Sequence, residues 1–315
     1  MVYLTGETMG SSWNVHIAQE VAQVAKERIQ SMIEMVLEEV NQQMSPFIPQ
    51  SEISLFNDNP STAPIALSPA MYYVVRQALT LCEQTDGVYD ITVEPLVNIW
   101  GFGAKEVKSH PDDAQVADTL RYVNYRYLSL TEEGLRKEYP QTRIDLCSIA
   151  KGYGVDKVAE VLEKEGIHHY LVEIGGELRL SGSRYDQAWR VGVERPQWGG
   201  GVYEHMLTFK EVTIGVATSG NYRNYFKDKE KVASHEINTQ TGYTKVSEIL
   251  SVTVLAENCM LADGYATALF LLGEKAIEFA EKQQIAALFI VNDDSHEKGY
   301  ALRISSAFAR FINAK

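Results

Sequence analysis

The stretch Ala262-Asp263-Gly264-Tyr265-Ala266-Thr267-Ala268-Leu269 is the part of the sequence from which the fold is most readily worked out. It follows residues 250–256, a run rich in β-branched side chains that is typical of a strand. It opens an apolar segment, residues 266–272, that predicts a helix. Asp263 and Thr267 are four residues apart, so a helix places them on one face.

A carboxylate and a hydroxyl on one helix face offer hard oxygen ligands, and such ligands suit Mg²⁺. A structural alternative is at least as good for the octapeptide alone. In that alternative Asp263 caps the helix, and Thr267 faces solvent or bonds back to the helix backbone. The choice between the two therefore depends on the rest of the chain.

The composition limits the class of protein. With 315 residues, of which 45% are hydrophobic, the chain can form one large domain or two intertwined lobes. The net charge of −13 makes nucleic acid and anionic membranes poor partners. No run of about 18 apolar residues is present, so we expect no membrane span.

The cysteines and the N-terminus bear on location. Cys82, Cys147 and Cys259 are odd in number and include no CxxC pair, which argues against a disulfide framework or a zinc site. The printed chain begins without a basic and apolar leader. We expect a cytoplasmic protein; the alternative is a periplasmic lipoprotein whose leader is missing from the printed sequence.

Strand and helix patterns alternate along the whole chain, without low-complexity tracts. They predict a layered α+β fold in which helices pack on antiparallel or mixed sheets. The predicted helices cover 20–44, 51–57, 68–85 and 273–283, with caps at Ser51 and Ser68, and a turn followed by a helix covers 147–165. The predicted strands are a pair over 3–17 and single strands over 127–130, 143–146, 169–174, 177–181, 189–193, 207–218 and 286–291, followed by a final strand and helix.

Three further positions are candidates for a functional site. Asp90 lies between apolar residues, so it is a buried functional carboxylate or a structural cap. Lys151 follows a predicted strand and turn at a helix start, where phosphate binding is favoured, although an ordinary surface lysine is the likelier local interpretation. His235 is a catalytic candidate beside a glycine turn, but a lone histidine is more often structural.

Taken together, the motifs resemble the ApbE family, whose members are flavin transferases that use FAD to attach FMN to protein. Each motif is weak alone, but nine occur in the family's order. They are Met9-Gly10-Ser11, Ser51-Glu52-Ile53-Ser54, 86–92, Trp100-Gly101-Phe102-Gly103, 144–152, Ile174-Gly175-Gly176, 218–222, His235-Glu236-Ile237 with Thr241-Gly242, and 262–269.

The resemblance implies a single domain over residues 1–315, built of two interlocked α/β lobes similar to a T-fold, with FAD in the groove between them. It implies Mg²⁺ bound by the Asp263 carboxylate, the Thr267 hydroxyl and the backbone oxygen of Ser148. It also implies a set of residues around FAD: Met9, Phe47, a strand formed by Val88, Tyr89 and Asp90, and Asp145, Lys151 and Ile237. In such a site His235 lies near the flavin phosphate.

Two positions depart from the family pattern. Many members have Tyr where Phe47 stands, so stacking on the flavin or adenine would persist without the hydroxyl hydrogen bond. Many have Pro after Asp in the stretch that matches Asn238–Gly242, so we expect Asn238-Thr239 to form a looser loop.

The implied activity is Mg²⁺-dependent transfer of FMN from FAD to a Thr or Ser hydroxyl of an acceptor flavoprotein subunit, with release of AMP. The hydroxyl needs a base, for which His235 is the first candidate and Asp263 the second. Two alternatives remain open: an FAD pyrophosphatase that makes FMN and AMP, and a flavin-binding protein without chemistry.

Overall fold

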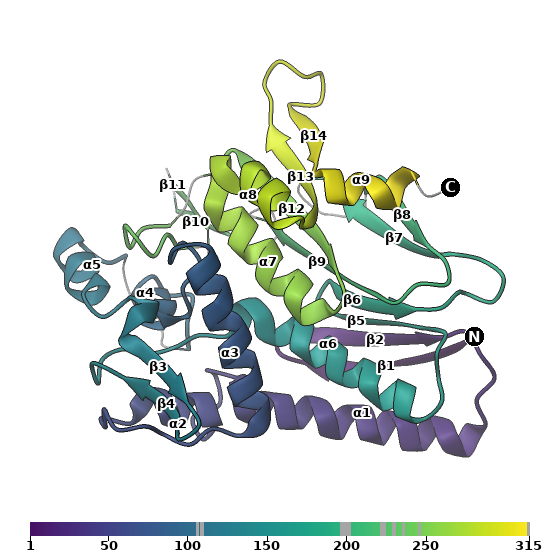
Figure 1. The fold of residues 1–315 in the computed structure, drawn as a ribbon, viewed down its shortest axis with the longest axis horizontal. Helices are drawn as coiled ribbons and strands as arrows, with labels where there is room; N and C mark the ends of the chain where they lie inside the picture. Colours follow the sequence, from purple (N-terminus) through teal and green to yellow (C-terminus); the bar gives the residue numbers. More distant parts are fainter. Residues whose placement is uncertain are drawn as a thin grey trace. The chain divides into compact units, whose positions relative to one another are not determined.

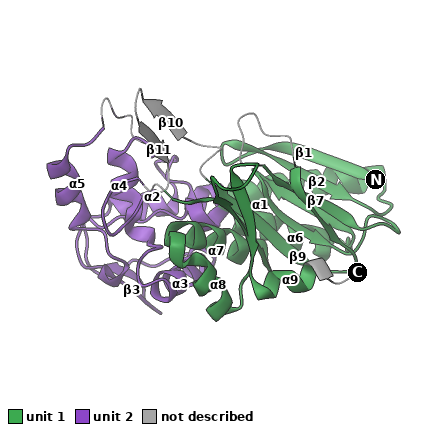
Figure 2. Cartoon of the chain, turned by 90° about the horizontal axis from the view of Figure 1, so that it is seen from above, with its two compact units in different colours: residues 1–39, 151–223, 247–315 green, residues 40–150, 224–246 purple. Residues whose placement is uncertain are grey.

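The computed structural model describes residues 1–104, 107, 110–195, 203–220, 225–228, 231–234, 237–244 and 247–313. The chain divides into two compact units, coloured separately in Figure 2. Unit 1 comprises residues 1–39, 151–223 and 247–315, and unit 2 comprises residues 40–150 and 224–246. Each unit is therefore assembled from segments that are distant in sequence.

Unit 1 is built on an eight-stranded sheet in which every neighbouring pair is antiparallel (Figure 1). The predicted α+β class with antiparallel sheets and packed helices is thus confirmed. In order across the sheet, the strands are β1 (Val2–Thr8), β2 (Ser11–Ile17), β5 (Tyr170–Ile174), β6 (Glu177–Ser181), β9 (Ile214–Gly220), β12 (Ile249–Ala256), β13 (Ala286–Asn292) and β14 (Tyr300–Ile304).

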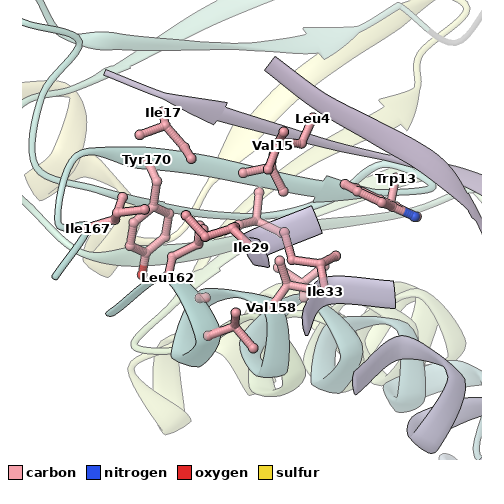
Figure 3. Close-up of a cluster of buried hydrophobic side chains, with 14 of the residues drawn as sticks. Leu4, Trp13, Val15, Ile17, Ile29, Ile33, Val158, Leu162, Ile167 and Tyr170 are labelled. Carbon is pink, nitrogen blue, oxygen red and sulfur yellow. The ribbon is translucent and has the colours of Figure 1, made fainter. Parts of the chain in front are cut away.

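Helices α1 (Gln23–Met44) and α6 (Cys147–Lys164) cover the part of this sheet formed by β1, β2 and β5 (Figure 3). Alternate residues of a strand point to the same face, and this face carries large apolar side chains. Figure 3 shows those of β2 and β5 directed at the helices. The buried set includes Trp13, Val15, Ile17, Tyr170, Ile29, Ile33, Val158 and Leu162.

The other half of the sheet holds the helix that carries the predicted metal ligands. Helices α7 (Cys259–Leu272) and α8 (Ala276–Gln283), joined by a short 3-10 turn (Gly273–Lys275), pack on β9, β12 and β13. The opposite face of these strands is buried by the hairpin of β7 (Trp189–Glu194) and β8 (Tyr203–Phe209) and by α9 (Ser306–Asn313). Both faces of the strands beneath α7 are therefore buried.

Unit 2 is mainly helical. Its α2 (Glu52–Asp58) and α3 (Pro69–Gln84) begin at the predicted caps, where the hydroxyls of Ser51 and Ser68 accept the N–H three residues later. The remaining elements are the 3-10 helices η1 (Ile91–Val93) and η2 (Tyr125–Tyr127), helices α4 (Glu94–Ile99) and α5 (Asp113–Leu120), and the strand pairs β3 (Leu128–Thr131) with β4 (Gly134–Lys137) and β10 (Tyr225–Asp228) with β11 (Lys231–Ser234).

Two predicted strands of unit 2 are wrong. Residues 143–146 pair with no strand in the described part of the chain; the Asn57 amide hydrogen-bonds to the backbone of Ile144 instead. The Val88-Tyr89-Asp90 segment, which we expected to be a strand, is a turn that leads into η1. In both places the described backbone bonds go to side chains and to single backbone groups, such as the Thr85 hydroxyl and the Ile91 carbonyl, and not to a neighbouring strand.

Within the described ranges, the model contains no helix that is both long and apolar enough to cross a bilayer.

Candidate functional site

Helix α7 begins at Cys259, earlier than the sequence suggested, because Asn258 is its N-cap and accepts from the Leu261 N–H at 2.9 Å. Asp263 consequently lies inside the helix and is not its cap. Asp263 and Thr267 are both buried. The structural alternative, with Asp263 as the cap and Thr267 in solvent, is therefore wrong.

Each of the two side chains has a defined partner in unit 1. The Gly152 N–H on α6 donates to Asp263 Oδ2 at 2.9 Å. The Thr267 hydroxyl lies 3.1 Å from the Ser219 hydroxyl on β9. These contacts orient one carboxylate oxygen and one hydroxyl, which are the oxygen types that suit Mg²⁺.

The approach of α6 to α7 depends on Gly152. A Cβ at this position would lie 2.4 Å from the Cys259 carbonyl oxygen and 2.8 Å from Asp263 Cβ, closer than side chains tolerate. With no side chain at this position, the Gly152 N–H reaches the Asp263 carboxylate directly.

Lys151 is not an ordinary surface lysine. Its Nζ lies 2.7 Å from Glu177 Oε1, and the Glu177 side chain retains only 6% of its exposure. The lysine side chain itself is 34% exposed, so its ammonium is bound by a buried carboxylate while part of the side chain still reaches solvent. A cation fixed in this way can also contact an anionic substrate.

The oxygen donors of α7 fit a hard divalent cation, since they comprise a carboxylate and a hydroxyl on one helix face. Among the described residues there is no group of three or more His, Cys, Asp or Glu side chains that could form a metal centre by themselves. A site built here would therefore need oxygen ligands from hydroxyls, the backbone or the substrate.

Within unit 2, Tyr89, Asp90 and Asp145 were predicted to lie around FAD. The buried Tyr89 hydroxyl is 2.8 Å from the Ser148 hydroxyl. Asp90 accepts from the Thr92 N–H and hydroxyl and from the Tyr125 N–H. Burial raises the pKa of the Asp90 carboxyl, and these hydrogen bonds oppose the rise. Asp90 is thus a structural cap, as the local alternative proposed, and its contact with FAD stays a prediction.

Asp145 accepts from the Cys147 N–H at 2.6 Å, in the turn just before Ser148. Burial raises its pKa as well. The carboxylates of Asp145 and Asp90 both face polar backbone groups, yet only Asp145 lies next to the predicted metal-binding residue of this unit. We find no direct partner for it beyond Cys147 among the hydrogen bonds described.

The remaining predicted contacts with FAD differ in exposure. Phe47 is 60% exposed, Val88 is half-buried, and Ile237 is buried against Leu96 and Val123. Met9, in unit 1, forms with Gly10 the two-residue turn between β1 and β2; both have positive φ. The Met9 side chain packs on the core of its unit. The contact of these four residues with FAD stays a prediction.

The loop from Asn238 to Gly242 is not loose, contrary to expectation. The Asn238 side chain accepts from the N–H groups of Gln240 and Thr241. The Thr239 hydroxyl donates to the Gly87 carbonyl at 2.8 Å, and the Trp100 indole donates to the Gly242 carbonyl. Side-chain bonds thus order this loop. His235 lies outside the described residues.

Sequence inspection missed three residues that support these sites: Asn57, Asp156 and Glu177. Asn57 holds the segment before Asp145, Asp156 binds the start of α7, and Glu177 pairs with Lys151. Only Asp156 gave a sequence signal, as a lone acid on the apolar side of a predicted helix.

Comparisons with known proteins agree with this arrangement. The ApbE family matches residues 9–289. An FAD:protein FMN transferase of Vibrio cholerae serotype O1 is 39% identical over 99% of this chain and 93% of its own length, and one of Haemophilus influenzae is 38% identical over 100% and 92%.

Two solved structures are similar over almost the whole chain. The flavin transferase ApbE from Vibrio cholerae has a TM-score of 0.89 at 38% identity and covers 98% of each chain. The apo flavinyl transferase ApbE of Pseudomonas stutzeri has a TM-score of 0.88 at 31% identity, covering 100% of this chain and 97% of its own. With the fold, the ordered motifs and these matches in agreement, the chain belongs to the ApbE family.

Proposed function

We propose that this chain is an FAD:protein FMN transferase that uses Mg²⁺ to move FMN from FAD onto a Thr or Ser hydroxyl of an acceptor flavoprotein, releasing AMP. One observation carries the proposal beyond family membership. Helix α7 buries a carboxylate and a hydroxyl four residues apart, and the Gly152 N–H and the Ser219 hydroxyl orient them. A flavin-binding protein without chemistry has no need of such a pair.

In the proposed reaction the acceptor oxygen attacks the FMN phosphorus of FAD. The bond from this phosphorus to the bridging oxygen breaks, and the bridging oxygen leaves with AMP. The hydroxyl proton passes to a base, and a phosphoester links FMN to the acceptor. Charge develops on the pyrophosphate during this exchange, so cationic groups that are already in place lower the barrier.

Asp263 and Thr267 would hold Mg²⁺, which when bound would neutralise pyrophosphate charge. The prediction that the Ser148 backbone oxygen completes the ligand set remains a prediction. Lys151 would supply a second positive charge, since Glu177 holds its ammonium group in place before substrate binds. The base remains His235 in first place and Asp263 in second.

The test is flavin transfer by the native chain and by Asp263→Ala, followed as in-gel flavin fluorescence on an acceptor protein. The variant should give no labelled acceptor even at high Mg²⁺. Asp118→Ala, which removes an exposed acid on α5 of unit 2, is the matched control and should label normally. Labelling by Asp263→Ala at the native rate would rule out the role assigned to this carboxylate.

The same reactions distinguish transfer from hydrolysis. AMP released by the native chain in the absence of acceptor, over many turnovers, would favour the FAD pyrophosphatase. AMP released only when an acceptor is present is the outcome that the transferase proposal expects. FAD that remains intact with Mg²⁺ and acceptor would favour the binding protein without chemistry.

A further inference from the structure

Asp156, on α6, binds the first backbone N–H groups of α7. Its Oδ1 accepts from the Cys259 N–H at 2.9 Å, and its Oδ2 accepts from the Met260 N–H at 2.8 Å. The side chain is buried. The first N–H groups of a helix have no partner within it, so a carboxylate that accepts two of them fixes where the helix begins.

The rest of this helix start is also satisfied. The Asn258 side chain takes the next N–H, that of Leu261. The N-terminus is the positive end of the helix dipole, and a negative side chain is most favourable there. Asp156 therefore contributes both hydrogen bonds and charge to α7, from a helix that is distant from it in sequence.

Arg179, on β6, holds the Asp156 carboxylate in this orientation. One guanidinium nitrogen, Nη1, donates to Asp156 Oδ1 at 3.0 Å, while Nη2 donates to Glu163 Oε1 at 3.1 Å. The Tyr170 hydroxyl donates to the same Glu163 oxygen. Burial raises the pKa of Asp156, but the two backbone N–H groups and Arg179 oppose this by favouring the ionised form.

Two adjacent contacts join α6 to α7. Gly152 and Asp156 are four residues apart on α6 and so lie on one face. They bind Asp263 and the Cys259–Met260 start of α7, which are likewise three to four residues apart. A shift of α7 along its axis would break both contacts together, so Asp156 fixes the position of Asp263 relative to α6.

We infer that Asp156 is a positioning residue for the divalent cation site, acting through the start of α7 on Asp263 and Thr267. The inference rests on the proposed function, because that proposal assigns the cation to these two residues. Asp156 would not touch the cation itself. Loss of such outer partners typically weakens metal binding by about 10- to 100-fold.

The test is direct binding of Mn²⁺, a probe for hard oxygen sites, measured by electron paramagnetic resonance without FAD or acceptor. Asp156→Asn keeps the volume but replaces one acceptor by a donor, so one N–H of α7 loses its partner. We expect Mn²⁺ to bind this variant about 10- to 100-fold more weakly than the native chain. Asp156→Glu keeps the charge and both oxygens, so it should bind Mn²⁺ more tightly than Asp156→Asn but more weakly than the native chain. If Asp156→Asn does not fold, Asp156→Glu is the variant compared with the native chain.

Glu163→Gln is the matched control. Glu163 lies on the same helix, and its replacement removes the same charge and the other contact of Arg179. Its described hydrogen bonds go to Tyr170 and Arg179 and not to α7. We expect its Mn²⁺ affinity to stay within about twofold of native, since no outer partner of the site is lost. Thermal unfolding in chelator shows whether the two variants are comparably stable.

Native affinity in folded Asp156→Asn, or an equal loss in Glu163→Gln, would overturn the inference and leave the proposed function intact. If Mn²⁺ does not bind the native chain saturably, or binds Asp263→Ala as tightly as native, the cation site of the proposed function fails and the inference fails with it.

Discussion

Asn57 should be among the most sensitive residues of unit 2. It lies in the last turn of α2, and its side chain is buried. Its amide nitrogen donates to the Ile144 carbonyl at 2.8 Å, and its amide oxygen accepts from the Ile144 N–H at 2.7 Å. Asn57→Ala removes both bonds and leaves the extended segment before Asp145 without its support.

The size of the effect follows from the two backbone groups. Each buried group left without this partner costs about 1 to 3 kcal/mol, so together they lower the free energy of unfolding by about 2 to 6 kcal/mol. Neither Ile144 group can turn to a neighbouring strand, since the described structure has none beside this segment. Some of the loss is recovered if water enters the space left by the amide.

The measurement is urea denaturation of the native chain, Asn57→Ala and Asn59→Ala, followed by circular dichroism. Asn59 caps the same helix, but its side chain accepts only one bond, from the Ser61 N–H. Its removal should cost about 1 kcal/mol or less. A loss in Asn57→Ala no larger than that in Asn59→Ala would refute the reasoning that this amide holds the segment.

Two further substitutions test the site itself. Gly152→Ala places a Cβ against the Cys259 carbonyl and Asp263, so it should lower flavin transfer at least tenfold and destabilise the fold. Replacing Gly by Ala inside a helix normally stabilises it by about 0.5–1 kcal/mol. A variant that is active and more stable would therefore contradict the close approach of the two helices. Phe47 is exposed, so Phe47→Ala should leave the stability unchanged but weaken FAD binding by about 1 to 3 kcal/mol through lost stacking. Phe47→Tyr keeps the ring and should bind FAD as tightly as the native chain. Titration of flavin fluorescence measures the FAD affinity, and equal affinities of Phe47→Ala and the native chain would exclude Phe47 from the flavin site.

Elements whose signals are local were predictable from the sequence. Ser51 and Ser68 cap α2 and α3 because a hydroxyl three residues before a free N–H needs no distant partner. The β1–β2 hairpin was likewise predictable from its alternating pattern and the Met9-Gly10 turn. The antiparallel α+β class follows from the number and spacing of such elements.

Elements that depend on distant partners were not predictable. Residues 143–146 have the composition of a strand, but their hydrogen bonds go to Asn57 and, from the Asp145 N–H, to the Ile91 carbonyl. The start of α7 was placed too late because the Asn258 cap was overlooked, although Asn three residues before Leu261 is a local signal. The error over residues 143–146 thus arises where tertiary contacts override strand propensity, whereas the error at α7 is a missed local cap.

The candidate site divides in the same way. Asp263 and Thr267 could be paired from their spacing, because a helix fixes which residues share a face. Their burial, which excludes the simple cap, depends on the strands beneath α7 and could not be predicted from spacing. Asp156 and Glu177 likewise bind residues that are far away in the sequence. The activity was predicted from the resemblance to the ApbE family. These supporting side chains were identified only from the structure.

The most direct test of the proposed activity is stoichiometric. The native chain, FAD and Mg²⁺ are incubated with an acceptor protein, AMP is quantified by chromatography, and the acceptor is analysed by peptide mass spectrometry. The account predicts that a single Thr or Ser gains FMN less one water, with one AMP released for each flavin attached. AMP in large excess over attached flavin, or an acceptor that gains no flavin while FAD is consumed, would contradict it.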